Sequence, residues 1–157
     1  MKVRDHIRRN VITIKHNATF REALETMVHQ KTNGLIVLNE KGKAVGTIDS
    51  FNLIDQMVPD YLSDDPSLAQ FATENVFHKA VSDALNREVH EMMEPTGDIC
   101  VHEDDSMVYA ATLASKHDFR YIPVIDDTCD ELVGLVSRTD IKRAMAELLG
   151  IQDKAAK

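Results

Sequence analysis

Apolar residues follow the same order twice along the chain. Residues 3–57 align with residues 89–145, at an offset of 86 residues at the start and 88 at the end. In each copy a short apolar run is followed by an amphipathic stretch, two more apolar runs and a second amphipathic stretch. This repetition predicts two copies of one β-α-β-β-α unit.

The first copy shows the expected elements in detail. Thr19 and Glu22 stand at the spacing of a capping box, in which each side chain accepts a hydrogen bond from the other residue's backbone. The apolar stripe that follows predicts a helix with one face against a sheet; its members are Phe20, Ala23, Leu24, Met27 and Val28. The other expected elements are strands at 11–14, 35–38 and 44–48, a turn at 40–43, and a helix at 52–57 that Pro59 ends.

The second copy has the same elements with smaller apolar side chains. Asp105 and Ser106 open its first helix, and the small residues of the stripe let helix and sheet approach closely; the stripe is Met107, Ala110, Ala111 and Ala114. Strands are expected at 99–101, 121–125 and 132–136, with a turn at 126–130 and a helix at 140–149 that ends at Gly150.

A connector joins the two copies. Asp65 followed by Pro66 is typical of a helix N-cap and first helical position, and apolar residues keep helical spacing as far as Leu85, so one or two helices are expected. The predicted organisation is repeat 1 at 1–58, the connector at 59–88, repeat 2 at 89–149 and a C-terminal tail at 150–157.

The size of each repeat makes it marginal as an independent domain. A unit of about 60 residues buries only about 60% of the surface of its unfolded chain. The two repeats are therefore expected to pack on each other as a pseudo-twofold pair. The predicted fold class is mixed α/β (α+β).

Charge and composition exclude several classes of partner. The chain has 18 Lys and Arg against 26 Asp and Glu, which gives a formal net charge of −8 at pH 7. Such a field repels nucleic acid and anionic membrane surfaces. The start of the chain has no apolar signal segment, and Cys100 and Cys129 stand alone without metal-ligand spacing, so we expect a cytoplasmic protein with reduced thiols and no metal.

Candidate ligand-binding residues lie where the last strand of repeat 2 enters a helix, at Gly134 to Asp140. A helix N-terminus attracts anions, so the Ser137 hydroxyl there is suited to phosphate. Asp140 is suited to the two hydroxyls of a ribose. The alternative is a purely structural role, in which Ser137 and Asp140 only cap the helix.

Repeat 1 differs from repeat 2 at the matching positions. Asp49 replaces the hydroxyl and would repel phosphate, and Asn52 replaces the acid. Repeat 2 alone has Arg120 beside an aromatic residue, Tyr121, at a strand start. Repeat 1 is therefore expected to hold the weaker or the empty site.

These motifs together resemble the cystathionine-β-synthase (CBS) domain family as a tandem pair, or Bateman module. They are the repeated element order, Ile122-Pro123-Val124, and the run from Gly134 to Asp140. The resemblance implies binding of an adenosine-containing ligand (AMP, ADP, ATP or S-adenosylmethionine) in clefts between the repeats. It places Ser137 at phosphate and Asp140 at ribose, with Arg120 as a further phosphate contact; the base would meet Ile99, Tyr121 and Ile122.

The resemblance also implies a stand-alone regulatory sensor that pairs into a homodimer and signals through an effector protein whose identity the sequence does not reveal. The alternative is a structural dimerisation module with vestigial clefts. An enzyme is not expected, because no motif places a base, a nucleophile or a metal group.

Overall fold

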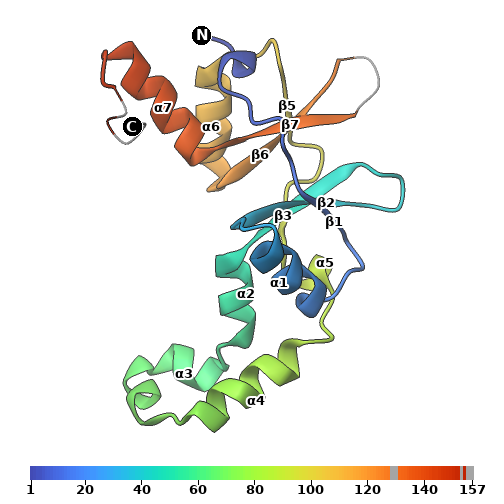
Figure 1. Ribbon diagram of the computed structural model, residues 1–157, viewed down its shortest axis with the longest axis vertical. Helices are drawn as coiled ribbons and strands as arrows, with labels where there is room; N and C mark the ends of the chain where they lie inside the picture. The colour runs from blue at the N-terminus through green and yellow to red at the C-terminus, as the bar shows by residue number, and fades with distance from the viewer. Residues whose placement is uncertain (128–130, 153, 155–157) are drawn as a thin grey trace. The chain divides into compact units, whose positions relative to one another are not determined.

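The computed structural model describes residues 1–127, 131–152 and 154, and it contains two small sheets with helices (Figure 1). The chain forms two compact units, and each unit draws on non-contiguous pieces of the sequence. Unit 1 contains residues 1–11, 43–45 and 96–157, whereas unit 2 contains residues 12–42 and 46–95. The predicted α/β fold class is confirmed, with two sheets where two repeats were expected.

The first sheet has the strand order β1-β2-β3-β4, and it combines three strands of repeat 1 with one from the start of repeat 2. Its strands are β1 (Thr13–Lys15), β2 (Gly34–Leu38), β3 (Ala44–Asp49) and β4 (Glu94–Pro95). β1 runs parallel to β2, and β4 is antiparallel to β3. The hairpin turn before β3 uses Gly42 at a φ of +75°, a conformation that glycine adopts without strain. The first strand begins two residues later than predicted, because the sheet takes up Thr13 and not Val11.

Helix α1 (Phe20–His29) begins at the predicted capping box. The Glu22 N–H donates to Thr19 Oγ1 at 3.2 Å, and the Thr19 N–H donates to Glu22 Oε2 at 2.8 Å. The predicted apolar stripe was too wide. Phe20 is buried, but Leu24 and Val28 are 38% and 63% exposed because only one edge of the stripe meets the core.

The connector is helical, but it has three helical segments where one or two helices were predicted. It comprises α3 (Asp60–Asp64), the 3-10 helix η2 (Pro66–Phe71) and α4 (Glu74–Ala84), and it follows α2 (Ser50–Met57). Asp65 caps η2 by accepting from the Ser67 N–H at 3.3 Å, which confirms the predicted start at Pro66. Apolar side chains of the connector remain exposed, Phe71 at 83% among them.

The second sheet has the order β5-β6-β7 and lies wholly in unit 1. Its elements are β5 (Val101–His102), α6 (Met107–His117), β6 (Tyr121–Ile125), β7 (Leu132–Ser137) and α7 (Arg138–Leu148). Ser106 caps α6 as expected, by accepting from the Tyr109 N–H at 3.1 Å. β5 begins two residues later than predicted. Cys129 and part of the predicted turn at 126–130 fall on residues 128–130, outside the described residues.

Three short elements before the first strands were not predicted. They are η1 (Val3–Asp5) in the N-terminal segment, residues 1–11, and α5 (Val89–Met92) with β4 in the matching segment, residues 89–95. The backbone of the N-terminal segment is hydrogen-bonded to the rest of unit 1, since the Val3 N–H donates to the Asp105 carbonyl at 2.9 Å.

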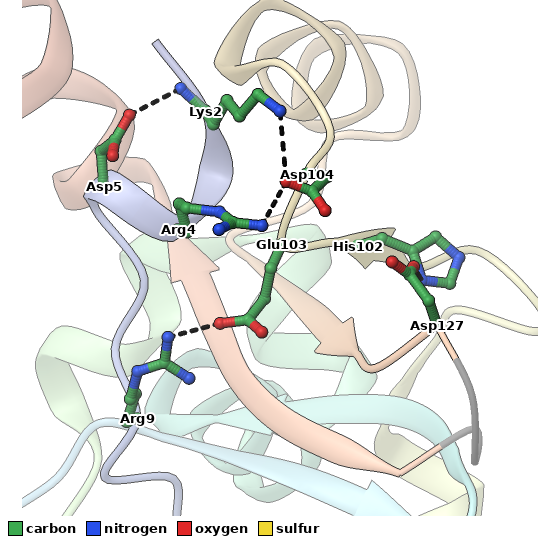
Figure 2. Close-up of polar contacts among 8 residues, drawn as sticks. All are labelled: Lys2, Arg4, Asp5, Arg9, His102, Glu103, Asp104 and Asp127. Carbon is green, nitrogen blue, oxygen red and sulfur yellow. Dashed lines mark hydrogen bonds and ion pairs between the residues drawn. The ribbon is translucent and has the colours of Figure 1, made fainter.

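Ion pairs add to this attachment of the N-terminal segment. Figure 2 shows Lys2 and Arg4 converging on Asp104, and Arg9 reaching Glu103, in the turn after β5. The N-terminal segment therefore belongs to the fold of unit 1.

Candidate functional site at the start of helix α7

Ser137 and Asp140 form a closed, buried pair at the start of α7. The Ser137 N–H and Oγ–H both donate to Asp140 Oδ2, at 2.8 and 2.7 Å, and the Asp140 N–H donates back to Ser137 Oγ at 3.3 Å. The two residues are 5% and 2% exposed. The predicted capping box is therefore confirmed. The same hydrogen bonds hold the serine hydroxyl at the positive end of the helix dipole.

Arg8 joins this pair from the N-terminal segment. Its Nε donates to Asp140 Oδ1 at 3.2 Å, and its Nη2 donates to Ser137 Oγ at 3.3 Å. A second cation is near, because Arg143 Nη1 lies 3.7 Å from the same Asp140 oxygen. Two guanidinium groups therefore face one buried carboxylate, which gives this site an excess of positive charge.

Sequence reasoning missed Arg8. Its place is set by backbone hydrogen bonds in both directions with Leu135, at 3.0 and 2.9 Å. Gly134 makes this pairing possible, since a Cβ there would lie 2.5 Å from the Arg8 carbonyl oxygen. The available signal was the repeat itself, because Arg8 aligns with Glu94 at the offset of 86 residues that holds at the start of the repeat.

The structure brings Tyr121 to the same end of the sheet. Tyr121 lies directly opposite Ser137 in the antiparallel pairing of β6 and β7, and residues opposite each other project from one face. The backbone carbonyl of Arg120 accepts from the Arg138 N–H at 3.1 Å, which holds the strand start against α7.

The other two predicted base contacts have a different environment. Ile122 is 1% exposed and belongs to the apolar core of unit 1, while Ile99 is partly buried against that core. Their placement shows a packing role. Contact with a base stays a prediction for Ile99, Ile122 and Tyr121.

The matching site of repeat 1 is built on the same backbone in unit 2. Asp49 caps α2 by accepting from the Asn52 N–H at 3.0 Å, and Asn52 Oδ1 accepts from the Asp49 N–H at 2.9 Å. Glu94 pairs with Thr47, two residues before the cap, as Arg8 pairs with Leu135. An acid thus stands where the other site has a cation.

Comparison with known proteins identifies the family. A sequence profile of the CBS domain matches residues 3–58 and 81–147. The chain belongs to the CBS domain family. Its two matched segments make it a tandem CBS pair, as the internal repeat predicted.

Curated CBS relatives are similar over most of this chain. The chloroplastic CBS domain-containing protein CBSX2 of Arabidopsis thaliana is 25% identical over 147 residues, which cover 90% of this chain and 61% of the relative. This CBS pair therefore spans about three fifths of the length of that relative. The L-aspartate semialdehyde sulfurtransferase of Methanocaldococcus jannaschii is 28% identical over 141 residues, which are 90% of this chain but 22% of the enzyme.

Solved CBS structures share the fold. CBSX2 in complex with AMP has a TM-score of 0.64 at 25% identity, covering 94% of this chain and 98% of that one. The CBS domain pair of protein MJ0100, in complex with 5′-methylthioadenosine and S-adenosyl-L-methionine, has a TM-score of 0.63 at 25% identity, covering 92% and 99%. Both structures were solved with adenosine-containing ligands.

Two further observations concern other kinds of site. Within residues 1–127, 131–152 and 154, no three His, Cys, Asp or Glu side chains gather in a way that would hold a metal ion; whether the protein uses a metal stays a prediction. In the same part of the chain, none of the helices has the length and apolar character needed to cross a bilayer.

Proposed function

We propose that this CBS pair is a regulatory module that binds an adenosine-containing nucleotide at the start of α7. The proposal rests on one observation, the buried Ser137–Asp140 pair to which the Arg8 guanidinium donates hydrogen bonds. A hydroxyl at a helix N-terminus and a guanidinium suit a phosphate, while a fixed carboxylate suits ribose hydroxyls. AMP, the ligand of the CBSX2 structure, has both a phosphate and a ribose, whereas the two ligands of the MJ0100 structure have the ribose but no phosphate.

The proposed stoichiometry is one nucleotide per chain. The site of repeat 1 presents Asp49, Asn52 and the exposed Glu94, so two carboxylates stand where phosphate would have to lie. Bringing a phosphate against two acids costs electrostatic free energy. AMP, ADP and ATP are the ligand candidates for repeat 2, and S-adenosylmethionine remains one by family resemblance.

Calorimetric titration with AMP tests this function. We expect saturable heat with a stoichiometry of one and an increase in melting temperature, because a ligand at 100 times its dissociation constant adds about 2.7 kcal/mol to the free energy of unfolding. The matched control is adenosine-free ribose 5-phosphate. A stoichiometry of two would contradict the assignment to repeat 2 alone, and absence of heat with every adenine nucleotide would favour the structural alternative.

The second candidate function is dimerisation, and exposed apolar residues favour it. Near the end of α7, Leu148 and Leu149 are 74% and 76% exposed, and Met145 is 61% exposed. We propose that a second copy of the chain covers these three side chains in a homodimer. The dimer would pass the nucleotide signal to an effector protein and would catalyse no reaction itself. Light scattering should show twice 17.6 kDa, and Leu148→Lys with Leu149→Lys should give the monomer.

A further inference from the structure

Arg8 is placed on the Ser137–Asp140 pair by the backbone, so its position does not depend on its side chain alone. Leu135 holds Arg8 through two backbone hydrogen bonds. Because side chains two residues apart on a strand share a face, the neighbour of Arg8 on that face of β7 is Ser137. The chain thus delivers one cation from the N-terminal segment to one buried hydroxyl.

The Arg8 guanidinium bridges the two groups assigned to different parts of a nucleotide. Nε is bound to Asp140 Oδ1, the oxygen not used by Ser137, and Nη2 is bound to Ser137 Oγ. These bonds use two of the five N–H groups of a guanidinium. The Arg8 side chain is 45% exposed whereas that of Asp140 is 3% exposed, so an incoming anion meets Arg8 before it meets the acid.

We propose that Arg8 couples phosphate recognition to ribose recognition, so that the site selects 5′-phosphorylated adenosine over adenosine. The proposal rests on the proposed function. A phosphate arriving at Ser137 accepts from Arg8 and draws the guanidinium off Asp140. Asp140 Oδ1 then loses its closer guanidinium, keeps Arg143 Nη1 at 3.7 Å, and can accept from the ribose hydroxyls. A nucleoside has no phosphate with which to move Arg8, and its ribose must compete with a guanidinium for the carboxylate.

A purely structural role for Arg8 predicts something different. If Arg8 only fastened the N-terminal segment to α7, its loss would disturb Ser137 and Asp140 in the same way for every adenosine ligand. The ratio of AMP affinity to adenosine affinity would then stay constant. That ratio is the quantity that separates the two roles.

The experiment is calorimetric titration of wild type, Arg8→Gln and Arg8→Lys with AMP and with adenosine. For Arg8→Gln we expect AMP affinity to fall about tenfold to a hundredfold, the range for losing a hydrogen bond to a charged group. Adenosine affinity should stay the same or rise. Arg8→Lys keeps the charge on a flexible stem and should restore part of the preference for AMP.

Arg9→Gln is the matched control. It removes the same charge from the neighbouring residue, whose partner is Glu103 and not the Ser137–Asp140 pair, and it should leave the ratio of affinities unchanged. Equal losses for AMP and adenosine in Arg8→Gln would overturn the coupling while leaving nucleotide binding in place. If wild type binds no AMP, the proposed function falls and this inference with it. Should Arg8→Gln fail to fold, an unchanged ratio in Arg8→Lys overturns the coupling by itself.

Discussion

The starts of helices α7 and α2 have the same backbone and opposite chemistry. Each helix is capped by the last residue of the preceding strand, and each cap is reciprocated three residues later. In each case the residue two positions before the cap, Leu135 or Thr47, pairs with a short segment that precedes the first strand of a repeat. At α7 the three side chains are Ser137, Asp140 and Arg8, whereas at α2 they are Asp49, Asn52 and Glu94.

This contrast shows what the fold requires and what it leaves open. Capping needs only a side-chain oxygen at the cap and an acceptor three residues on, and both sites supply them. Capping does not depend on the charge of the residue that pairs beside the cap. Its difference, Arg8 against Glu94, therefore points to ligand choice.

The largest expected effect comes from giving α2 the chemistry of α7. The triple variant Asp49→Ser, Asn52→Asp and Glu94→Arg should raise the calorimetric stoichiometry for AMP from one to two per chain. Serine and aspartate are about equally good at an N-cap, so the helix should persist. Adding Asp140→Ala should then weaken one of the two sites and leave the other unchanged. A triple variant that still binds one AMP would show that the missing determinant of repeat 1 lies elsewhere.

Truncating the acid at α7 should have the next largest effect. Asp140→Ala should weaken AMP binding by about 1.5 to 3 kcal/mol, while Asn52→Ala should change it little. Because Asp140→Ala also removes part of the helix cap, at a cost of about 0.5 to 2 kcal/mol in stability, titrations need protein shown by circular dichroism to be folded. Equal effects of the two variants would remove the asymmetry between the sites.

The two close glycines should differ in their tolerance of a methyl group. A Cβ at Gly134 would lie 2.5 Å from the Arg8 carbonyl oxygen, whereas a Cβ at Gly46 would lie 2.8 Å from the Glu94 carbonyl oxygen and 2.6 Å from the flexible Met93 Sδ. Gly134→Ala should lower the free energy of unfolding by about 1 to 3 kcal/mol, and Gly46→Ala by less. Urea unfolding of both variants measures this order, and the reverse order would mean that the N-terminal segment is loosely held.

The smallest effect concerns pH. Asp104 stands where repeat 1 has Asn17, and a hydrogen bond from Lys2 together with the charge of Arg4 lowers the pKa of Asp104 below its ordinary value. A carboxyl with a lowered pKa stabilises the folded state above its unfolded pKa, and this contribution is lost as pH falls through the folded value. The melting temperature of Asp104→Asn should therefore lie slightly below wild type at pH 7 and converge with it as the pH falls below the lowered pKa of Asp104. A constant gap would mean that the side chain contributes by packing.

Local patterns in the sequence predicted the elements well because their causes are local. Thr19 with Glu22, and Ser137 with Asp140, interact across three residues, and each pair was visible as a capping signal. The exposure of Leu24 shows the limit of such reasoning, since a helical stripe does not reveal how far a sheet extends beneath it.

Arg8 could not be predicted in the same way. Its partner Asp140 is 132 residues away in sequence, and only the pairing with Leu135 brings the two together. The unpredicted elements η1, α5 and β4 have the same origin, because short segments of this kind gain their structure from the sheet beside them. What the sequence did contain was a charge difference between Arg8 and Glu94, which gains meaning once their pairing is known.

Unit 1 combines residues 1–11 and 43–45 with residues 96–157, and this division has a consequence for biosynthesis. All of unit 2 lies within residues 12–95, so its parts are available once residue 95 has left the ribosome, and domains fold as their residues emerge. Arg8 is made before unit 2, whereas Leu135 and Asp140 are made after it. The pairing of Arg8 with Leu135 closes a long loop of chain. The entropic cost of this closure is only slightly larger than for a short loop, because each doubling of loop length costs about 0.6 kcal/mol. The cluster of Arg8, Ser137 and Asp140 can therefore form only after the whole of unit 2 has been made.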